Sequence, residues 1–466
     1  MRYNGIMKDC ITPCVCCALA VSSALAQCPP QRLLPPEHPA PISSFGARLE
    51  MNGRHLLIAD AQAATLCGGS SGCASGAVYA HEFKDGAWVR TQAIVPPDVW
   101  WADAYGIDLD LDGDTLIVGS YNATALTGIS AGGAYVYDYD GEGWVETARF
   151  VPPEPVGRSG FGRTVQLDDG VALVTQRQGV YVFAEDAGGW SWVQKLTPPD
   201  GVPLDAYFGN AMELTDEWLF IGAPFDDSLV PNGGSVYVYR RDGAEFTFTQ
   251  KINPADPSIS PSLGVALAYD GVSLFASGYI ADGVFEGEGA VYRYEFDGNQ
   301  WMLAEDITSD PRVRRAGFGS SLDVLGDTLV VGADLERIIG SPMVGAAYLF
   351  DRQPDDRWQQ THRLTPGRPT SQFGTAVAVH ESRVVVGASD EREGDRVPGA
   401  AHAYDLACLA CPADMDADGV LTVFDFLMFF NAFDAGDLMI ADFDGDGELT
   451  IFDFLAFQTA FDAGCG

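Results

Sequence analysis

The sequence has little positive charge and few histidines. Its 466 residues include 27 lysines and arginines and 6 histidines, against 65 aspartates and glutamates, which gives a formal net charge of −38. Nucleic acids and anionic membrane surfaces attract basic proteins, so this balance argues against both as partners. The histidines are scattered among expected strands and turns, and none has the spacing of a catalytic triad. Nothing in the residue pattern requires an enzyme.

Long apolar runs are also missing after the first 26 residues. No later segment approaches the ~20 apolar residues that a membrane-spanning helix needs. Residues 1–26 have a weakly basic start, a short apolar run and a small-residue cleavage site, which is typical of a secretory signal peptide. A lipoprotein signal fits less well, because Gln27 stands where a small residue is expected before Cys28. We therefore expect a secreted, extracellular protein.

A repeat dominates the rest of the chain. Successive units start 60, 56, 47, 55, 55 and 55 residues apart. Alternating apolar residues, with Gly, Asp and Asn at the turns, predict four short strands in each unit. Seven such units predict an all-β, seven-bladed β-propeller over residues 27–407. The units open at Phe45-Gly46, Tyr105-Gly106, Phe161-Gly162, Phe208-Gly209, Leu263-Gly264, Phe318-Gly319 and Phe373-Gly374.

The seventh unit lacks its last strand. In the other units this strand runs from an aromatic residue to a proline, with endings such as QAIVPP (92–97) and QKLTPP (194–199). The stretch QRLLPP (31–36) has the same pattern but lies at the other end of the chain. An incomplete last blade would leave an exposed sheet edge. We therefore predict that residues 31–36 complete blade seven and close the ring.

These units resemble FG-GAP repeats, the blades of integrin-type propellers, over about residues 31–407. The resemblance rests on the FG openings, the VGA-type second strands and the GAxY third strands. Calcium-binding blades of that family carry an acidic loop between their first two strands, whereas here this turn usually has two or three residues. Residues 108–113 imitate a DxDxDG loop, but Leu116 stands where a further carboxylate would be needed. We interpret this segment as a strand ending in an Asp-Gly turn, with a calcium site as the alternative.

The tail, residues 408–466, differs in kind. DMDADGVLTVFD starts at residue 414, and DFDGDGELTIFD follows 28 residues later. EF-hand calcium loops have oxygen ligands at positions 1, 3, 5 and 12, glycine at position 6 and a backbone carbonyl at position 7. The spacing therefore predicts two calcium ions in a small, α-helical, paired EF-hand-like domain. The expected ligands are Asp414, Asp416, Asp418, Val420 (carbonyl) and Asp425 in one site, and Asp442, Asp444, Asp446, Glu448 (carbonyl) and Asp453 in the other.

Aspartate at position 12, two tandem loops and a helix expected after each loop resemble a dockerin, the module that attaches secreted proteins to cohesin domains. The closing GCG and the cysteine before the first loop resemble GC-type dockerins. This resemblance implies a cohesin-like partner, which would place the protein in a soluble complex or on a cell surface. Loop positions 10 and 11 help to select the cohesin in that family, and here they are Val423, Phe424, Ile451 and Phe452. We interpret most phenylalanines of the tail as its core.

Six cysteines remain after the expected signal peptide, and an even number in an oxidising compartment indicates three disulfides. Fifteen pairings are possible. The predicted fold favours a clasp across one loop of blade one, a clasp around the two calcium loops, and a bridge at the ring closure. The pairs are Cys67–Cys73, Cys411–Cys465 and Cys28–Cys408. The CxxC at 408–411 is the alternative zinc or redox motif, but no second CxxC or histidine pair accompanies it.

The loops of the predicted propeller differ between its two faces. Loops that join strands two and three, and those that join one blade to the next, emerge on one face, here called the long-loop face. Its aromatic and acidic residues suit recognition of a glycan or a protein surface, so we expect an adhesion-type binding or scaffold protein. The alternative is an extracellular polysaccharide-degrading enzyme, which would need two carboxylates facing each other across the axis. The ligand candidates are Trp100, Trp101, Tyr121, Phe225, Asp226 and Asp227.

Overall fold

The computed structural model describes most of the chain after residue 29. No helix among the described residues is long and apolar enough to cross a membrane. The described ranges are 30–36, 42–63, 75–96, 103–124, 130–155, 157–177, 179–201, 206–256, 262–278, 288–337, 344–366, 372–393, 396–406, 413–415, 421–441, 443 and 449–463.

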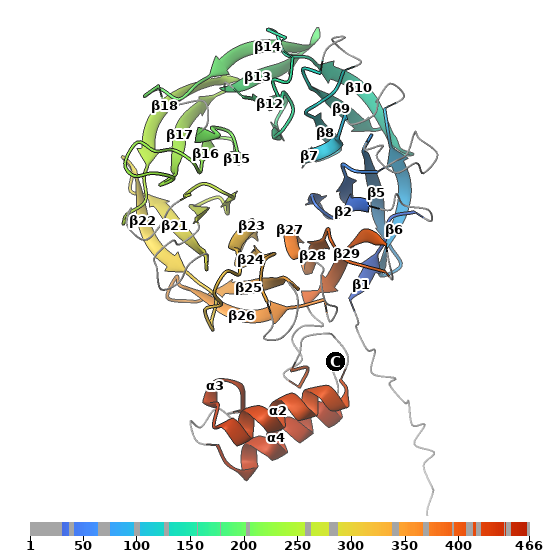
Figure 1. The fold of residues 1–466 in the computed structure, drawn as a ribbon, viewed down its shortest axis with the longest axis vertical. Helices are drawn as coiled ribbons and strands as arrows, with labels where there is room; N and C mark the ends of the chain where they lie inside the picture. The colour runs from blue at the N-terminus through green and yellow to red at the C-terminus, as the bar shows by residue number, and fades with distance from the viewer. Residues whose placement is uncertain are drawn as a thin grey trace, which may run out of the picture.

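Seven sheets stand around a central axis and form a ring, as Figure 1 shows. Blades one and two contain β3 (Leu49–Met51), β4 (His55–Asp60), β5 (Ala77–Lys84), β6 (Ala87–Ile94), β7 (Tyr105–Asp112), β8 (Thr115–Ser120), β9 (Gly133–Tyr139) and β10 (Trp144–Phe150). Blades three and four contain β11 (Val165–Asp168), β12 (Val171–Gln176), β13 (Gly179–Asp186), β14 (Gly189–Leu196), β15 (Met212–Leu214), β16 (Trp218–Ala223), β17 (Ser235–Asp242) and β18 (Glu245–Ile252).

The remaining blades repeat this order, so the predicted seven-bladed β-propeller is confirmed. The second strands of blades one, three, four and five (β4, β12, β16 and β20) are buried at all six positions, and β8 of blade two is buried at its last five. They are buried because the neighbouring blades cover both faces of each sheet. Blades five to seven contain β19 (Leu267–Tyr269), β20 (Ser273–Gly278), β21 (Ala290–Phe296), β22 (Trp301–Ile307), β23 (Phe318–Leu325), β24 (Thr328–Ala333), β25 (Ala346–Arg352), β26 (Trp358–Leu364), β27 (Phe373–His380), β28 (Arg383–Ala388) and β29 (Val397–Asp405).

The ring closes with the first strand of the chain. Strand β1 (Gln31–Leu33) pairs antiparallel with β29, and Arg32 lies opposite His402. Strand β2 (Ile42–Phe45) adds a parallel contact to β29. The prediction that residues 31–36 contain the missing strand of blade seven is therefore confirmed.

The glutamines of the fourth strands explain the repeated QxxxPP pattern. The Gln92 amide accepts a hydrogen bond from the Trp144 backbone N–H of the next blade (2.7 Å) and donates to the Trp144 carbonyl (3.0 Å). Gln250 makes the same two bonds to Trp301. Gln31 of the closing strand makes them to Trp88 of blade one. The first strand therefore restores both the edge pairing of blade seven and its link to blade one.

Two glycines bring the backbones of adjacent blades into contact. A Cβ atom at Gly387, in the second strand of blade seven, would lie 1.9 Å from the carbonyl oxygen of Gly46, the FG glycine of blade one. A Cβ atom at Gly119 would lie 2.1 Å from the corresponding oxygen of Gly162. Because no side chain fits there, glycine in both the VGA-type and FG segments sets the spacing between blades.

The tail contains helices α2 (Val423–Ala435), α3 (Leu438–Ala441) and α4 (Ile451–Ala463), which lie outside the ring in Figure 1. The Phe429 and Phe457 rings stack with centroids 4.2 Å apart, and both side chains are fully buried. Other phenylalanines pack around this pair, so the interpretation of most of them as core is confirmed. They are Phe426, Phe433, Phe443, Phe454 and Phe461.

Candidate functional site

A pocket of about 340 Å³ opens beside blade three, whose connection between its second and third strands is short. Only residues 177–178 join β12 to β13, whereas residues 121–132 and 224–234 make the same connection in blades two and four. The short connection corresponds to the 47-residue spacing in the sequence. This short connection leaves a hollow between the neighbouring blades.

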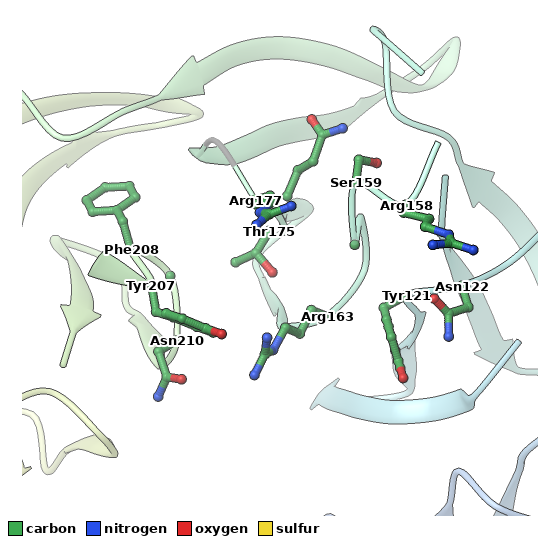
Figure 2. Close-up of a pocket in the computed structure, with 13 residues that line it drawn as sticks. Tyr121, Asn122, Arg158, Ser159, Arg163, Thr175, Arg177, Tyr207, Phe208 and Asn210 are labelled. Carbon is green, nitrogen blue, oxygen red and sulfur yellow. The ribbon is translucent and has the colours of Figure 1, made fainter. Parts of the chain in front are cut away.

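Connections of the long-loop face form the pocket walls. Bridges such as Gly132 to Phe161 join the end of a blade's strand 2–3 loop to the first residues of the next blade, so both kinds of connection lie at one edge of the sheets. Figure 2 shows Tyr121 on the blade-two side, Tyr207 on the blade-four side and Arg163 between them. The lining residues are Tyr121, Asn122, Arg158, Ser159, Gly160, Arg163, Thr175, Gln176, Arg177, Tyr207, Phe208, Gly209 and Asn210.

The described residues that line this pocket include three arginines and no carboxylate, although the chain is rich in acidic residues. All three arginines, Arg158, Arg163 and Arg177, are exposed. The Arg163 guanidinium lies 5.0 Å from the centre of the Tyr207 ring, a cation–π contact. Among the described residues, none of the three guanidinium groups has a carboxylate within salt-bridge distance. The pocket is therefore a cationic site in an anionic protein.

The uncharged polar groups of the floor are bound to the framework. The Ser159 hydroxyl donates to the Ala131 carbonyl (2.8 Å), and the Asn210 amide donates to the Val265 carbonyl (3.0 Å). The Thr175 hydroxyl accepts from the Thr164 backbone N–H at 2.8 Å. These side chains hold neighbouring strands together. The hydrogen-bonding capacity that faces the pocket comes mainly from the arginines, each of which has five N–H donors.

The sequence-predicted ligand candidates divide into two groups. Tyr121 lines the pocket, and the exposed Phe225 lies beside it, with its ring 5.2 Å from that of Tyr207. Asp226, in contrast, is buried and accepts a hydrogen bond from the Tyr237 hydroxyl at 2.8 Å, and Asp227 accepts from a backbone N–H of its own loop. The two carboxylates therefore hold the loop. Trp100 and Trp101 lie outside the described residues.

Buried ion pairs hold the strand 2–3 loops of blades four and seven in place. Asp226 lies 2.7 Å from the Lys251 ammonium. Burial raises the pKa of Asp226, but hydrogen bonds from Lys251, Ser228 and Tyr237 outweigh it and hold the pKa below its ordinary value. In blade seven, Glu391 contacts Arg32 and His402, each at 2.6 Å. Arg32 of the closing strand is therefore a cation that pairs with the loop carboxylate Glu391 of blade seven.

A second cavity, also of about 340 Å³, lies among the first strands of the blades. Glu50, Asp110, Glu213 and Asp323 line it from four blades. Burial and mutual repulsion raise the pKa values of Glu50 and Glu213 well above the ordinary range, and burial raises that of Asp110 to about 7. No group of three or more histidines, cysteines or carboxylates in the described part of the chain is arranged to hold a metal ion.

The DxDxDG segment of blade two is a strand, as we predicted. Asp110 accepts a hydrogen bond from the Leu167 backbone N–H of blade three at 2.6 Å. Asp108 and Asp112 bond in the same way to Val165 and Asp169. The alternating aspartates therefore link the first strands of adjacent blades, and the turn follows at residues 113–114.

Two of the predicted calcium ligands are buried carboxylates with equivalent contacts. Asp425 accepts from the backbone N–H groups of Met415 (2.8 Å) and Thr422 (2.7 Å). Asp453 accepts from those of Phe443 (2.8 Å) and Thr450 (2.7 Å). Each position-12 carboxylate thus reaches back to the start of its loop. Asp414 is also described, whereas Asp416, Asp418, Val420, Asp442, Asp444, Asp446 and Glu448 lie outside the described residues.

The predicted partner-binding residues are exposed in equivalent pairs. Val423 and Ile451 are each 63% exposed, and Phe424 and Phe452 are 65% and 64% exposed. These residues occupy the first turns of α2 and α4, so the two helices present similar apolar surfaces. The six cysteines of the predicted disulfides, Cys28, Cys67, Cys73, Cys408, Cys411 and Cys465, lie outside the described residues.

Sequence reasoning missed the three arginines and Tyr207. The usable signals were the 47-residue unit, which is shorter than the others, and the clustering of three scarce cations around it. Periodicity shows which residues form strands, but it does not show which loops meet across a gap.

Comparison with known proteins supports the repeat assignment. The FG-GAP repeat family model matches residues 88–137 and 190–239. Each match begins near the fourth strand of one blade and ends in the third strand of the next. The chain is therefore a β-propeller with FG-GAP repeats. A search of curated proteins found no match.

Solved structures that match this chain share little sequence with it. A periplasmic gluconolactonase from Pseudomonas aeruginosa is 14% identical, with a TM-score of 0.44 over 68% of this chain and 84% of its own. The β-propeller domain of the Trilobed protease from Pyrococcus furiosus is 10% identical, with a TM-score of 0.45 over 78% and 96%. A KlHsv2 variant with a replaced loop is 9% identical, with a TM-score of 0.45 over 78% and 99%.

Proposed function

We propose that this protein is a secreted, calcium-binding scaffold whose propeller binds a ligand on the long-loop face while its tail anchors it to a cohesin-like partner. The observation that carries the binding role is the open pocket at blade three, which neighbouring blades do not fill. The anchoring role is supported by the duplicated, exposed apolar turns of α2 and α4. The signal peptide and the three disulfides predicted from the sequence are part of this proposal.

The tail residues suit calcium. Residues 408–466 contain twelve aspartates and glutamates and no lysine, arginine or histidine. Asp425 and Asp453 are fully buried, and although each accepts backbone hydrogen bonds, no basic side chain of the tail balances its charge. The two loops would hold the ions through the ligands predicted above. Calcium would supply the positive charge that the tail itself lacks.

The full-length protein provides the test of the tail. Titration with calcium after chelation should give two bound ions, and the double substitution Asp425→Asn and Asp453→Asn should remove most of this binding. A matched control is Asp434→Asn, because Asp434 is an exposed aspartate outside both loops. Binding of no calcium, or equal binding by the double variant and the parent, would contradict the calcium assignment.

The partner assignment needs a separate measurement. Calcium-loaded full-length protein should bind a cohesin domain, and Phe424→Ser together with Phe452→Ser should weaken that binding by at least tenfold without changing calcium stoichiometry. Loss of both exposed rings removes apolar contact area without opening the core. Undiminished binding by this variant would show that the apolar turns are not the docking surface.

The axial carboxylates support a second candidate function, glycoside hydrolysis. Glu50 and Glu213 line one cavity, and a carboxyl group whose pKa is raised suits the general acid, while hydrolysis also needs an ionised carboxylate as nucleophile or base. Polysaccharide hydrolysis by the full-length protein, lost in both Glu50→Gln and Glu213→Gln, would establish an enzyme. Activity that survives both substitutions would exclude these carboxylates.

A further inference from the structure

We infer that the pocket at blade three binds an acidic sugar, a ring that carries a carboxylate or sulfate group. This inference deepens the proposed binding function, on which it rests, by naming the class of ligand. Its first support is charge. Arg158, Arg163 and Arg177 line one hollow, and no carboxylate among the described residues lies within salt-bridge distance of them.

The contrast with other arginines of the propeller supports an anion as the ligand. Arginines elsewhere in the described propeller, such as Arg32, Arg241 and Arg363, have carboxylates at salt-bridge distance. These three arginines are buried or half-buried, and exposed arginines such as Arg54 and Arg90 contact tyrosines instead of carboxylates, but they do not share a pocket. A site that keeps three guanidinium groups available has the electrostatics for an anion, because these groups bind carboxylate and sulfate-like groups through paired N–H donors.

The shape of the site favours a compact ring. A volume of about 340 Å³ lies at the lower end of the range for small-molecule pockets. Extended peptides are commonly recognised along sheet edges or grooves, whereas this pocket is bounded by loops of three consecutive blades. One or two sugar rings match its size better than an extended peptide does.

Aromatic side chains supply the third support. Tyr207 is 42% exposed and Tyr121 is partly exposed, and the two lie on opposite sides of Arg163 in Figure 2. A tyrosine ring offers an apolar face with a polar hydroxyl at its edge, so it can pack against the C–H face of a sugar while bonding to a hydroxyl group. The combination of tyrosine and arginine therefore fits a ring that is part apolar and part anionic.

The charge of the whole protein limits the length of the ligand. A net charge of −38 means that the protein as a whole repels a long polyanion. A short oligosaccharide or a chain end avoids that repulsion. We therefore expect a short acidic oligosaccharide to bind at least as tightly as its polymer.

Calorimetry with the full-length protein tests the inference. The probes are a galacturonate trisaccharide, the neutral galactose trisaccharide, galactose 6-sulfate, sulfate ion alone and an aspartate-rich peptide. We expect the galacturonate or the sulfated sugar to bind at least 30-fold more tightly than the neutral sugar. The stronger of these two identifies the preferred anion.

Arginine variants locate the site. The triple substitution Arg158→Gln, Arg163→Gln and Arg177→Gln should weaken acidic-sugar binding by at least 100-fold, since three charge-assisted contacts are lost. Arg314→Gln is the matched control, because Arg314 is exposed in the connection leading to blade six and lies outside the pocket lining. It should bind like the parent. Calcium stoichiometry and the thermal midpoint report whether each variant is folded.

Several results would overturn the inference. These are equal binding of neutral and acidic sugars, unchanged binding by the triple variant, binding of the peptide or sulfate ion without binding of either acidic sugar, and binding of no probe. A neutral glycan or a protein that binds at the long-loop face would still satisfy the proposed function. Failure of the ligand class is therefore distinguishable from failure of the binding role.

Discussion

Blades three and four have the same framework but opposite surfaces. In blade four, residues 224–234 form a loop whose Asp226 receives hydrogen bonds from Tyr237 and Lys251. In blade three, two residues replace this loop, and the corresponding Lys195 lies over the Tyr181 ring, 5.0 Å from its centre. The difference shows that a blade is open when it lacks the loop that carries this carboxylate.

The framework allows this change because other contacts join the blades. Gln194 of blade three donates to the Ala244 carbonyl of blade four at 3.2 Å, on the outer side of the ring. Gln166 accepts from the Leu214 backbone N–H at 3.1 Å, near the axis. Neither bond involves the shortened loop. Loop length can therefore vary without loss of blade packing.

Transfer of the loop should have the largest effect. Replacing residues 177–178 with the sequence of residues 224–234 should fill the pocket and reduce acidic-sugar binding by at least 100-fold. The thermal midpoint should change little, because the contacts between blades remain. Calorimetry and a thermal scan measure the two quantities. Retained sugar binding in a folded chimera would show that the gap is not the site.

Removal of the blade-four carboxylate should be the next largest effect. Asp226→Ala leaves the Tyr237 hydroxyl and Lys251 without their buried acceptor, and we expect a loss of about 2–3 kcal/mol in the free energy of unfolding. This expected loss is smaller than for an ion pair with no other partner, because Asp200 also contacts Lys251 and would still pair with it. Asp227→Ala is the control, with an expected loss of about 0.5 kcal/mol. Denaturant unfolding compares the two, and equal losses would contradict the ion-pair argument.

Equivalent lysines of blades four and three, Lys251 and Lys195, allow the two blades to be compared by the same substitution. Lys251→Gln should cost about 2 kcal/mol, because Asp226 stays buried without its cation. Lys195→Gln in blade three should cost about 0.5 kcal/mol, since only a cation–π contact is lost. Unfolding midpoints of the two variants provide the measurement. The interpretation fails if Lys195 proves the more important of the two.

The axial cavity should produce the smallest effect, through pH. The raised pKa of Asp110, about 7, means that folding favours its protonated form. The contribution of this group to stability therefore falls as pH rises from the ordinary aspartate pKa of about 4 to about 7, and the full penalty remains above pH 7. We expect Asp110→Asn to be more stable than the parent at pH 8 by about 1 kcal/mol, and this gain to shrink at pH 5. A gain that is independent of pH would exclude titration as its cause.

Much of the fold could be predicted from the sequence because its determinants recur. The FG glycines, the alternating second strands and the QxxxPP endings repeat with the blades, so even the closing strand at residues 31–33 was identifiable. The pocket could not be predicted in the same way. Arg158 and Arg163 lie in the connection between β10 and β11, whereas Arg177 lies in the short connection between β12 and β13, and the pocket that all three line exists because this second connection is short. Asp226 looked like a ligand residue because burial of a loop carboxylate has no local sequence signature.

The closing strand has a consequence for how the chain folds. Arg32 and Glu391, which hold blade seven closed, are 359 residues apart along the chain. Contacts at such separation pay a large loop-closure entropy and form late, after the intervening blades have restricted the chain. Strand β1 is synthesised early but finds its partner only when β29 exists. Ring closure is therefore the last step of propeller assembly, and a chain cut short before β29 cannot complete it.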